Sequence, residues 1–219
     1  MFAAKNLLLA PKAASGGGVV AYDAEGSGST ILSSAGTAFT WSHTVNTAGA
    51  TIYADIVSDR SNTLSPVTCD GTAMTLVGTV TLTGGNSGDG FISRYKITGA
   101  SAVAHTISVT PSADAWMAYG STSFTGVGSE GAAQTVTGTG TSASQSATCS
   151  TGQMILQAFI GIGSSGSLGK LSSTGGTALF NANNSYAGLS IGDASASTAF
   201  SCSMPGATYW GGLANALAA

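Results

Sequence analysis

Charged side chains are scarce in this chain, where Asp, Glu, Lys and Arg make up only 7% of the residues, against about 25% in an ordinary globular domain. Six Lys and Arg stand against nine Asp and Glu, too few for the basic stripe that binds phosphates. We therefore expect no nucleic-acid partner. Because charged side chains are too few to keep the protein soluble, hydroxyl groups and the backbone must do so, or neighbouring subunits must cover much of the surface.

Residues that perform acid–base and metal chemistry are also few. The three cysteines, Cys69, Cys149 and Cys202, are widely spaced and form no Cys-x-x-Cys pair, so a zinc site has no support from the spacing. Three buried thiols are favoured, and one disulfide plus a free thiol is the alternative. No Gly-x-Ser-x-Gly motif occurs. We predict no catalytic residue, no cofactor, no metal and no enzymatic activity.

Two pairs of polar residues stand out against this scarcity. His43 and His105 each lie on the apolar face of an expected strand, and adjoining strands would make them a metal-binding or pH-sensitive pair. Core or interface histidines are favoured, because no carboxylate lies at ligand spacing along the chain. Asp55 and Asp59 are interpreted as solvated carboxylates near a strand end. A glycan- or ester-cleaving enzyme is the least favoured class.

Long apolar runs are missing too, and none approaches the roughly 20 residues of a membrane span. The N-terminal run, residues 7–10, is shorter than the apolar core of a signal peptide and is followed by Pro11. We interpret residues 1–18 as a docking arm with a glycine hinge; a mobile terminus is the alternative. The expected contact residues of this arm are Phe2, Leu7, Leu8 and Leu9.

What the chain does contain is a repeated alternation of apolar and polar residues. Residues 38–45, 91–97 and 103–110 alternate with period two, which predicts half-buried strands. Residues 51–57 and 154–160 are more evenly apolar and predict central strands covered on both faces. Tight-turn pairs such as Asp70-Gly71 and the loop at 84–90 separate the runs. The fold class is all-β.

A weak internal similarity runs through the sequence. Residues 71–74 resemble residues 176–179, and Pro111 with Trp116 corresponds in spacing to Pro205 with Trp210. Tandem domains would explain it, but no linker separates the parts and a half alone would bury little core. We therefore favour a single antiparallel sandwich with two similar halves, spanning residues 19–219.

Aromatic residues are the most informative candidates for a binding surface. Outward-facing rings beside hydroxyls and amides would stack on sugar rings, whereas buried rings fill a core or a subunit interface. Core or interface positions are favoured for the set as a whole. The candidates for glycan or partner contact are Trp116, Tyr119, Tyr209 and Trp210.

Three stretches carry a resemblance to a known family: residues 70–77, residues 94–110 and residues 209–214. Their pattern of strands and turns resembles the minor tail proteins of actinobacterial siphophages, over residues 20–219. The resemblance implies a jelly-roll sandwich in the virion, located in the tail or, alternatively, on the capsid as a decoration protein. It implies other virion proteins as partners, a homo-oligomer with a trimer favoured, and contact with a host-surface glycan. A carbohydrate-binding module or adhesin is the competing function.

Overall fold

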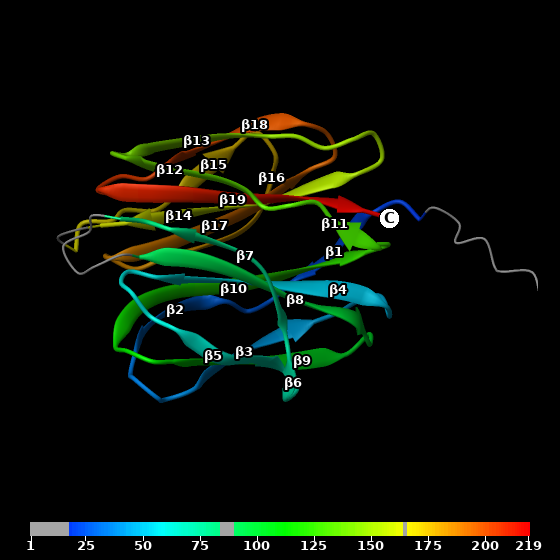
Figure 1. Ribbon diagram of the computed structural model, residues 1–219, viewed down its shortest axis with the longest axis horizontal. Helices are drawn as coiled ribbons and strands as arrows, with labels where there is room; N and C mark the ends of the chain where they lie inside the picture. Colours follow the sequence, from blue (N-terminus) through cyan, green and yellow to red (C-terminus); the bar gives the residue numbers. More distant parts are fainter. Residues whose placement is uncertain (1–17, 84–89, 164–165) are drawn as a thin grey trace, which may run out of the picture.

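The computed structural model describes residues 18–83, 90–163 and 166–219, which form antiparallel strands and contain no helix. The expected docking arm, with Phe2, Leu7, Leu8 and Leu9, lies outside the described residues except for Gly18, as does most of the loop at 84–90. Four sheets are stacked as layers, two central and two outer (Figure 1). The predicted all-β class is confirmed.

The N-terminal half of the chain supplies two of these layers. The first central sheet has the order β1-β10-β4-β8-β7, with β2 also paired to β10. The first outer sheet has the order β3-β9-β5-β6. The strands of the central sheet are β1 (Ala21–Glu25), β2 (Ser29–Ser33), β4 (Ala50–Ser58), β7 (Thr75–Thr81), β8 (Phe91–Ala100) and β10 (Ala115–Thr125). Those of the outer sheet are β3 (Phe39–Thr44), β5 (Leu64–Cys69), β6 (Thr72–Ala73) and β9 (Ala104–Pro111).

The C-terminal half supplies the other two layers. The second central sheet has the order β11-β19-β14-β17-β16, with β12 also paired to β19, and the second outer sheet has the order β13-β18-β15. The central strands are β11 (Ser129–Glu130), β12 (Gln134–Thr139), β14 (Met154–Ile162), β16 (Thr177–Asn183), β17 (Ala187–Ala194) and β19 (Tyr209–Ala218). The outer strands are β13 (Ser142–Ala147), β15 (Ser172–Thr174) and β18 (Thr198–Ser203).

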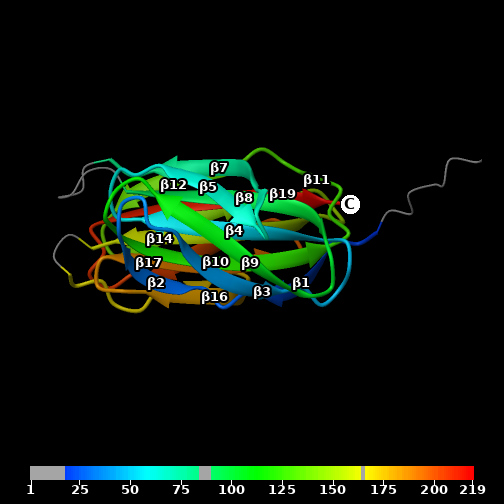
Figure 2. The same cartoon turned by 90° about the horizontal axis from the view of Figure 1, so that it is seen from below.

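The two central sheets have corresponding strand orders. Matching β10 with β19, β4 with β14 and β8 with β17 brings the two orders into agreement, including the extra strand, β2 or β12, on β10 or β19. Figure 2, viewed from below, looks along the stack of layers, with β9 of the first outer sheet crossing the central strands at an angle. Of the two sequence matches, Trp116 on β10 and Trp210 on β19 lie on corresponding strands, whereas residues 71–74 span β6 of an outer sheet and residues 176–179 begin β16 of a central sheet.

Burial explains why β4 and β14 are evenly apolar. Alternate β4 residues Ile52 and Ile56 belong to the core beneath the first outer sheet, whereas Tyr53 and Val57 belong to the core between the central sheets. Every β4 residue is buried, as expected for a strand covered on both faces. A third core lies between the second central and second outer sheets. The predictions for residues 51–57 and 154–160 are confirmed.

The alternation predicts β3 correctly but misjudges β8. On β3, Phe39, Trp41 and His43 are buried and the residues between them are exposed. On β8, Ile92 and Arg94 are as buried as Phe91 and Ser93. The half-buried prediction for β8 was therefore wrong in its first half, because the second central sheet covers the face that carries Arg94.

Arg94 joins the two central sheets through a buried network. Its guanidinium is fully buried and donates two hydrogen bonds to Asp55 on the adjacent β4, at 2.9 and 3.1 Å. The third nitrogen donates to the carbonyl of Leu156 on β14 at 2.8 Å and to Oδ1 of Asn215 on β19 at 3.1 Å. One side chain thus satisfies acceptors in both halves of the chain.

Two smaller features complete the fold. All three cysteines are free, with Cys69 and Cys202 buried and Cys149 partly exposed, so the expectation of three buried thiols holds for two of them. The Asp70-Gly71 turn is confirmed, with positive φ at both residues (48° and 78°). The described residues contain no helix that is long and apolar enough to span a membrane.

Candidate functional site

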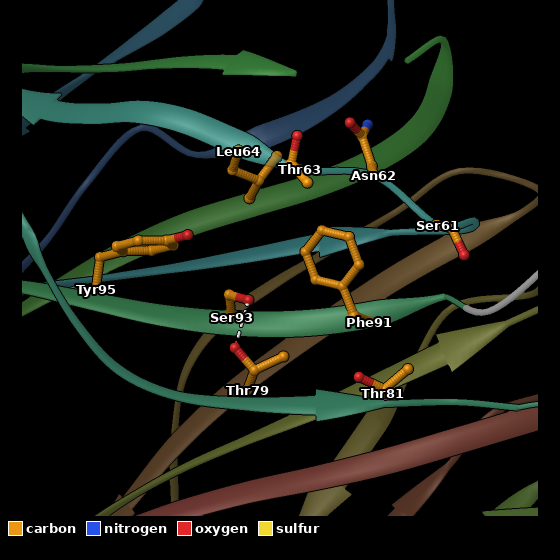
Figure 3. A pocket seen from close by; sticks show the side chains of 9 residues that line it. All are labelled: Ser61, Asn62, Thr63, Leu64, Thr79, Thr81, Phe91, Ser93 and Tyr95. Atoms are coloured by element: carbon orange, nitrogen blue, oxygen red, sulfur yellow. Dashed lines mark hydrogen bonds between the residues drawn. The ribbon is translucent and has the colours of Figure 1, made fainter. Parts of the chain in front are cut away.

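An open groove of about 410 Å³ lies between the edge of the first central sheet and the segment that leads into β5. Strands β7 and β8 form its floor, and residues 61–64 cross above them (Figure 3). The lining residues are Ser61, Asn62, Thr63, Leu64, Thr79, Thr81, Phe91, Ser93 and Tyr95.

The period of a strand places the floor residues on one face. Phe91, Ser93 and Tyr95 alternate along β8 and point to the same side, and Thr79 and Thr81 do the same on β7. The hydroxyls of Thr79 and Ser93 are hydrogen-bonded at 2.8 Å. The floor is therefore a fixed row of hydroxyls flanked by two aromatic rings.

The rim is held by Asn62, whose side chain is bound within the protein. Its Oδ1 accepts hydrogen bonds from the backbone N–H groups of Ser112 (2.8 Å) and Ala113 (3.1 Å). The backbone N–H of Thr63 donates to the hydroxyl of Ser112 at 2.9 Å. These bonds fix the segment above the floor and keep the groove open.

None of the nine described residues that line the groove has a side chain that is charged at neutral pH. Burial raises the pKa of Tyr95, outweighing the opposing hydrogen bond from Ser93, so this phenol stays protonated and can donate. In Figure 3 the Tyr95 hydroxyl points along the groove toward Phe91. Hydroxyls and rings without charge suit a neutral, hydroxyl-bearing ligand.

The aromatic candidates from the sequence do not form one surface. Tyr119 is 8% exposed and packs against Phe39 and Trp41, with ring centroids 4.9 and 4.8 Å apart. Trp116, three residues earlier on β10, belongs with the core between the central sheets and stacks on Tyr186 at 5.3 Å.

The second candidate pair lies on β19 and is also split between two faces. Trp210 is 8% exposed, and its indole N–H donates to the carbonyl of Thr139 at 3.2 Å. Tyr209 is partly exposed and lines a separate cavity of about 170 Å³ beside Leu82. The groove residues Phe91 and Tyr95 were not among the sequence candidates. Their alternation was visible, but the crossing segment at 61–64 was not.

The carboxylates considered in the sequence are bound within the protein. Asp55 is paired with Arg94, as described above. Asp59 is 4% exposed, pairs with Arg60 at 3.2 Å and accepts the backbone N–H of Trp116 at 3.0 Å. The expectation that both are solvated was wrong, because the surrounding backbone and arginines enclose them.

His43 and His105 do lie side by side, as register partners on β3 and β9. His43 is fully buried, its Nδ1 is 2.9 Å from the hydroxyl of Ser121, and burial lowers its pKa to about 4. His105 meets a carboxylate, because its Nδ1 lies 2.7 Å from Asp70. The spacing along the chain had hidden this carboxylate, which only the pairing of β5 with β9 brings near.

Family models, curated proteins and solved structures were compared with the chain, and none gives a match. The resemblance to phage minor tail proteins therefore stays a prediction.

Proposed function

We propose that this protein is a structural virion component that works through surface contact, of the phage minor tail protein type. The observation that supports this best is the outward face of the second outer sheet, which presents rows of small hydroxyls. Ser142, Ser203 and Ser172 stand in register across its three strands, and Ser144, Ser201 and Thr174 form the next row. All six are exposed.

The rows are ordered as well as uncharged. The hydroxyls of Thr174 and Ser201 are hydrogen-bonded at 2.8 Å. On the opposite side of the molecule, β3 exposes Thr40, Ser42 and Thr44 in the same way. Short side chains lose little conformational entropy when a second surface covers them. Both outer faces are therefore suited to close contact with another protein or with a saccharide layer.

The same proposal covers assembly and fine topology. We propose a homo-oligomer, with a trimer favoured, attached to other virion proteins through residues 1–18. We also propose a jelly-roll-like sandwich with two similar halves, supported by the corresponding strand orders of the central sheets. Location on the capsid as a decoration protein is the alternative within this class.

The contact role is tested by placing charge on the hydroxyl rows. We expect Ser144→Glu with Ser201→Glu to lower the mass of the purified protein in sedimentation and its incorporation into particles, because adjacent charges resist burial. Ser144→Ala with Ser201→Ala is the matched control and should assemble. If the charged variant assembles as the wild type does, the rows are not a contact surface. Immunolabelling of particles then distinguishes tail from capsid, and deletion of 1–18 tests the arm.

The groove favours a second candidate, a carbohydrate-binding module or adhesin. Titration of tryptophan fluorescence and calorimetry with neutral cell-wall polysaccharides should show saturable binding. Thr79→Val with Tyr95→Phe removes two groove hydroxyls at nearly constant shape and should weaken that binding. Thr135→Val, on the exposed face of β12, is the control and should bind normally. Equal affinity of both variants would exclude the groove as the glycan site.

A further inference from the structure

Three different donor side chains converge where β5 turns into β6. Cys69 ends β5, Asp70 opens the turn, and His105 lies on the neighbouring β9. One ligand atom from each, a sulfur, an oxygen and a nitrogen, lie within 4.8 Å of one another. This cluster is separate from the groove and from the hydroxyl rows.

The carboxylate of Asp70 is held in a fixed direction. Oδ1 of this carboxylate accepts a hydrogen bond from the backbone N–H of Thr106 at 2.7 Å, and the backbone N–H of Asp70 donates to the carbonyl of Thr106 at 2.8 Å. Asp70 has a positive φ at the turn that follows β5, the strand that pairs with β9. Oδ2 is thereby directed at Nδ1 of His105, 2.7 Å away.

The imidazole of His105 is oriented from its other side. Nε2 lies 2.9 Å from the carbonyl oxygen of Ser101, and a carbonyl only accepts, so Nε2 carries the hydrogen. Nδ1 faces a carboxylate oxygen, so without a metal ion a proton lies between Nδ1 and Oδ2, and a metal ion bound there would replace that proton. Histidines that bind metals are characteristically held this way, with the second N–H donated to a carbonyl.

The thiol of Cys69 completes the set. Its side chain is 3% exposed, and its sulfur lies within 4.8 Å of the ligand atoms of Asp70 and His105. A thiol must lose its proton to bind a metal ion. A divalent cation would replace that proton, and two anionic ligands would then balance its two charges.

We propose that Cys69, Asp70 and His105 bind a zinc ion. Sulfur, nitrogen and carboxylate oxygen are the donors that Zn²⁺ takes in proteins, and three protein ligands leave one position for water. The Asp70 side chain is half exposed and gives the ion access from solvent. Binding replaces the proton between Nδ1 and Oδ2, moves these atoms apart around the ion, and releases that proton together with the thiol proton.

The full chain, stripped with a chelator, tests the site by titration with Zn²⁺ in calorimetry and with Co²⁺ in absorption spectroscopy. We expect one ion per chain and a thiolate-to-cobalt charge-transfer band. Cys69→Ser should remove the band. Asp70→Asn, on an exposed turn where folding is least at risk, should weaken Zn²⁺ binding at least about tenfold.

Cys149→Ser is the matched control, because it removes a partly exposed thiol outside the cluster. It should keep the band, the stoichiometry and the affinity. Circular dichroism verifies that each variant is folded. Wild-type protein without stoichiometric binding, a band that survives Cys69→Ser, or unchanged affinity in Asp70→Asn would each overturn the proposal.

Discussion

Removal of the buried guanidinium should show how strongly the two central sheets depend on each other. In Arg94→Met the carboxylate of Asp55 stays fully buried and loses both of its hydrogen bonds to the guanidinium. The carbonyl of Leu156 and Oδ1 of Asn215 lose donors as well. Breaking a buried ion pair from one side costs about 3–5 kcal/mol, so we expect a loss of that size in unfolding free energy.

A second substitution isolates the charge from the packing. In the double variant Arg94→Met with Asp55→Leu no unpaired charge remains, and apolar replacement of a whole buried pair is often close to neutral. The unpaired carbonyl of Leu156 still costs about 1–3 kcal/mol. We therefore expect the double variant to be about 2 kcal/mol more stable than Arg94→Met alone.

Equilibrium unfolding in urea, followed by circular dichroism and by tryptophan fluorescence, measures both differences. Arg60→Met is the matched control, because its side chain is 35% exposed and Asp59 keeps the hydrogen bond from the backbone N–H of Trp116, so its loss should be smaller than that of Arg94→Met. A loss below about 1 kcal/mol in Arg94→Met, or a double variant that is no more stable than Arg94→Met, would refute the reasoning.

Three further perturbations have defined outcomes. In Gly120→Ala the new Cβ would lie 2.6 Å from the ring of Phe180 on β16, so we expect a loss of about 1–3 kcal/mol in urea unfolding. In Gly71→Ala nothing lies near the Cβ but φ is +78°, so backbone strain alone should cost about 1–2 kcal/mol. For Asp23, burial raises the pKa, but hydrogen bonds from Ser123, Thr47 and Asn46 outweigh burial and lower it overall. Its charged form therefore stabilises the fold above the unfolded pKa of about 3.9, and the destabilisation by Asp23→Asn should shrink as pH falls below about 4.

Each of these has a clear contrary result. Wild-type stability of Gly120→Ala would mean that Phe180 can move aside at no cost. A stable Gly71→Ala would mean that the turn accepts another backbone conformation. A pH-independent difference for Asp23→Asn would show that the carboxylate titrates alike in the folded and unfolded chain.

The sequence predicts strands better than it predicts what covers them. Residues 51–57 predict two buried faces because both faces are apolar. The second buried face of β8 is not predicted, because it carries Arg94, a residue type that is usually exposed. The acceptors that make Arg94 tolerable there are 62 and 121 residues away, beyond any local pattern. The groove and the cluster at His105 depend in the same way on a crossing segment and on the register of β5 against β9.

The hydroxyl rows on the outer sheets have a kinetic consequence. Surfaces without ions neither attract a partner from a distance nor lose affinity when electrolyte is added. Association through these faces should therefore have the rate constant of uncharged surfaces, about 10⁵–10⁶ M⁻¹ s⁻¹. This rate constant should be the same at low and at high ionic strength. Such a surface would hold its contacts in whatever medium the protein meets.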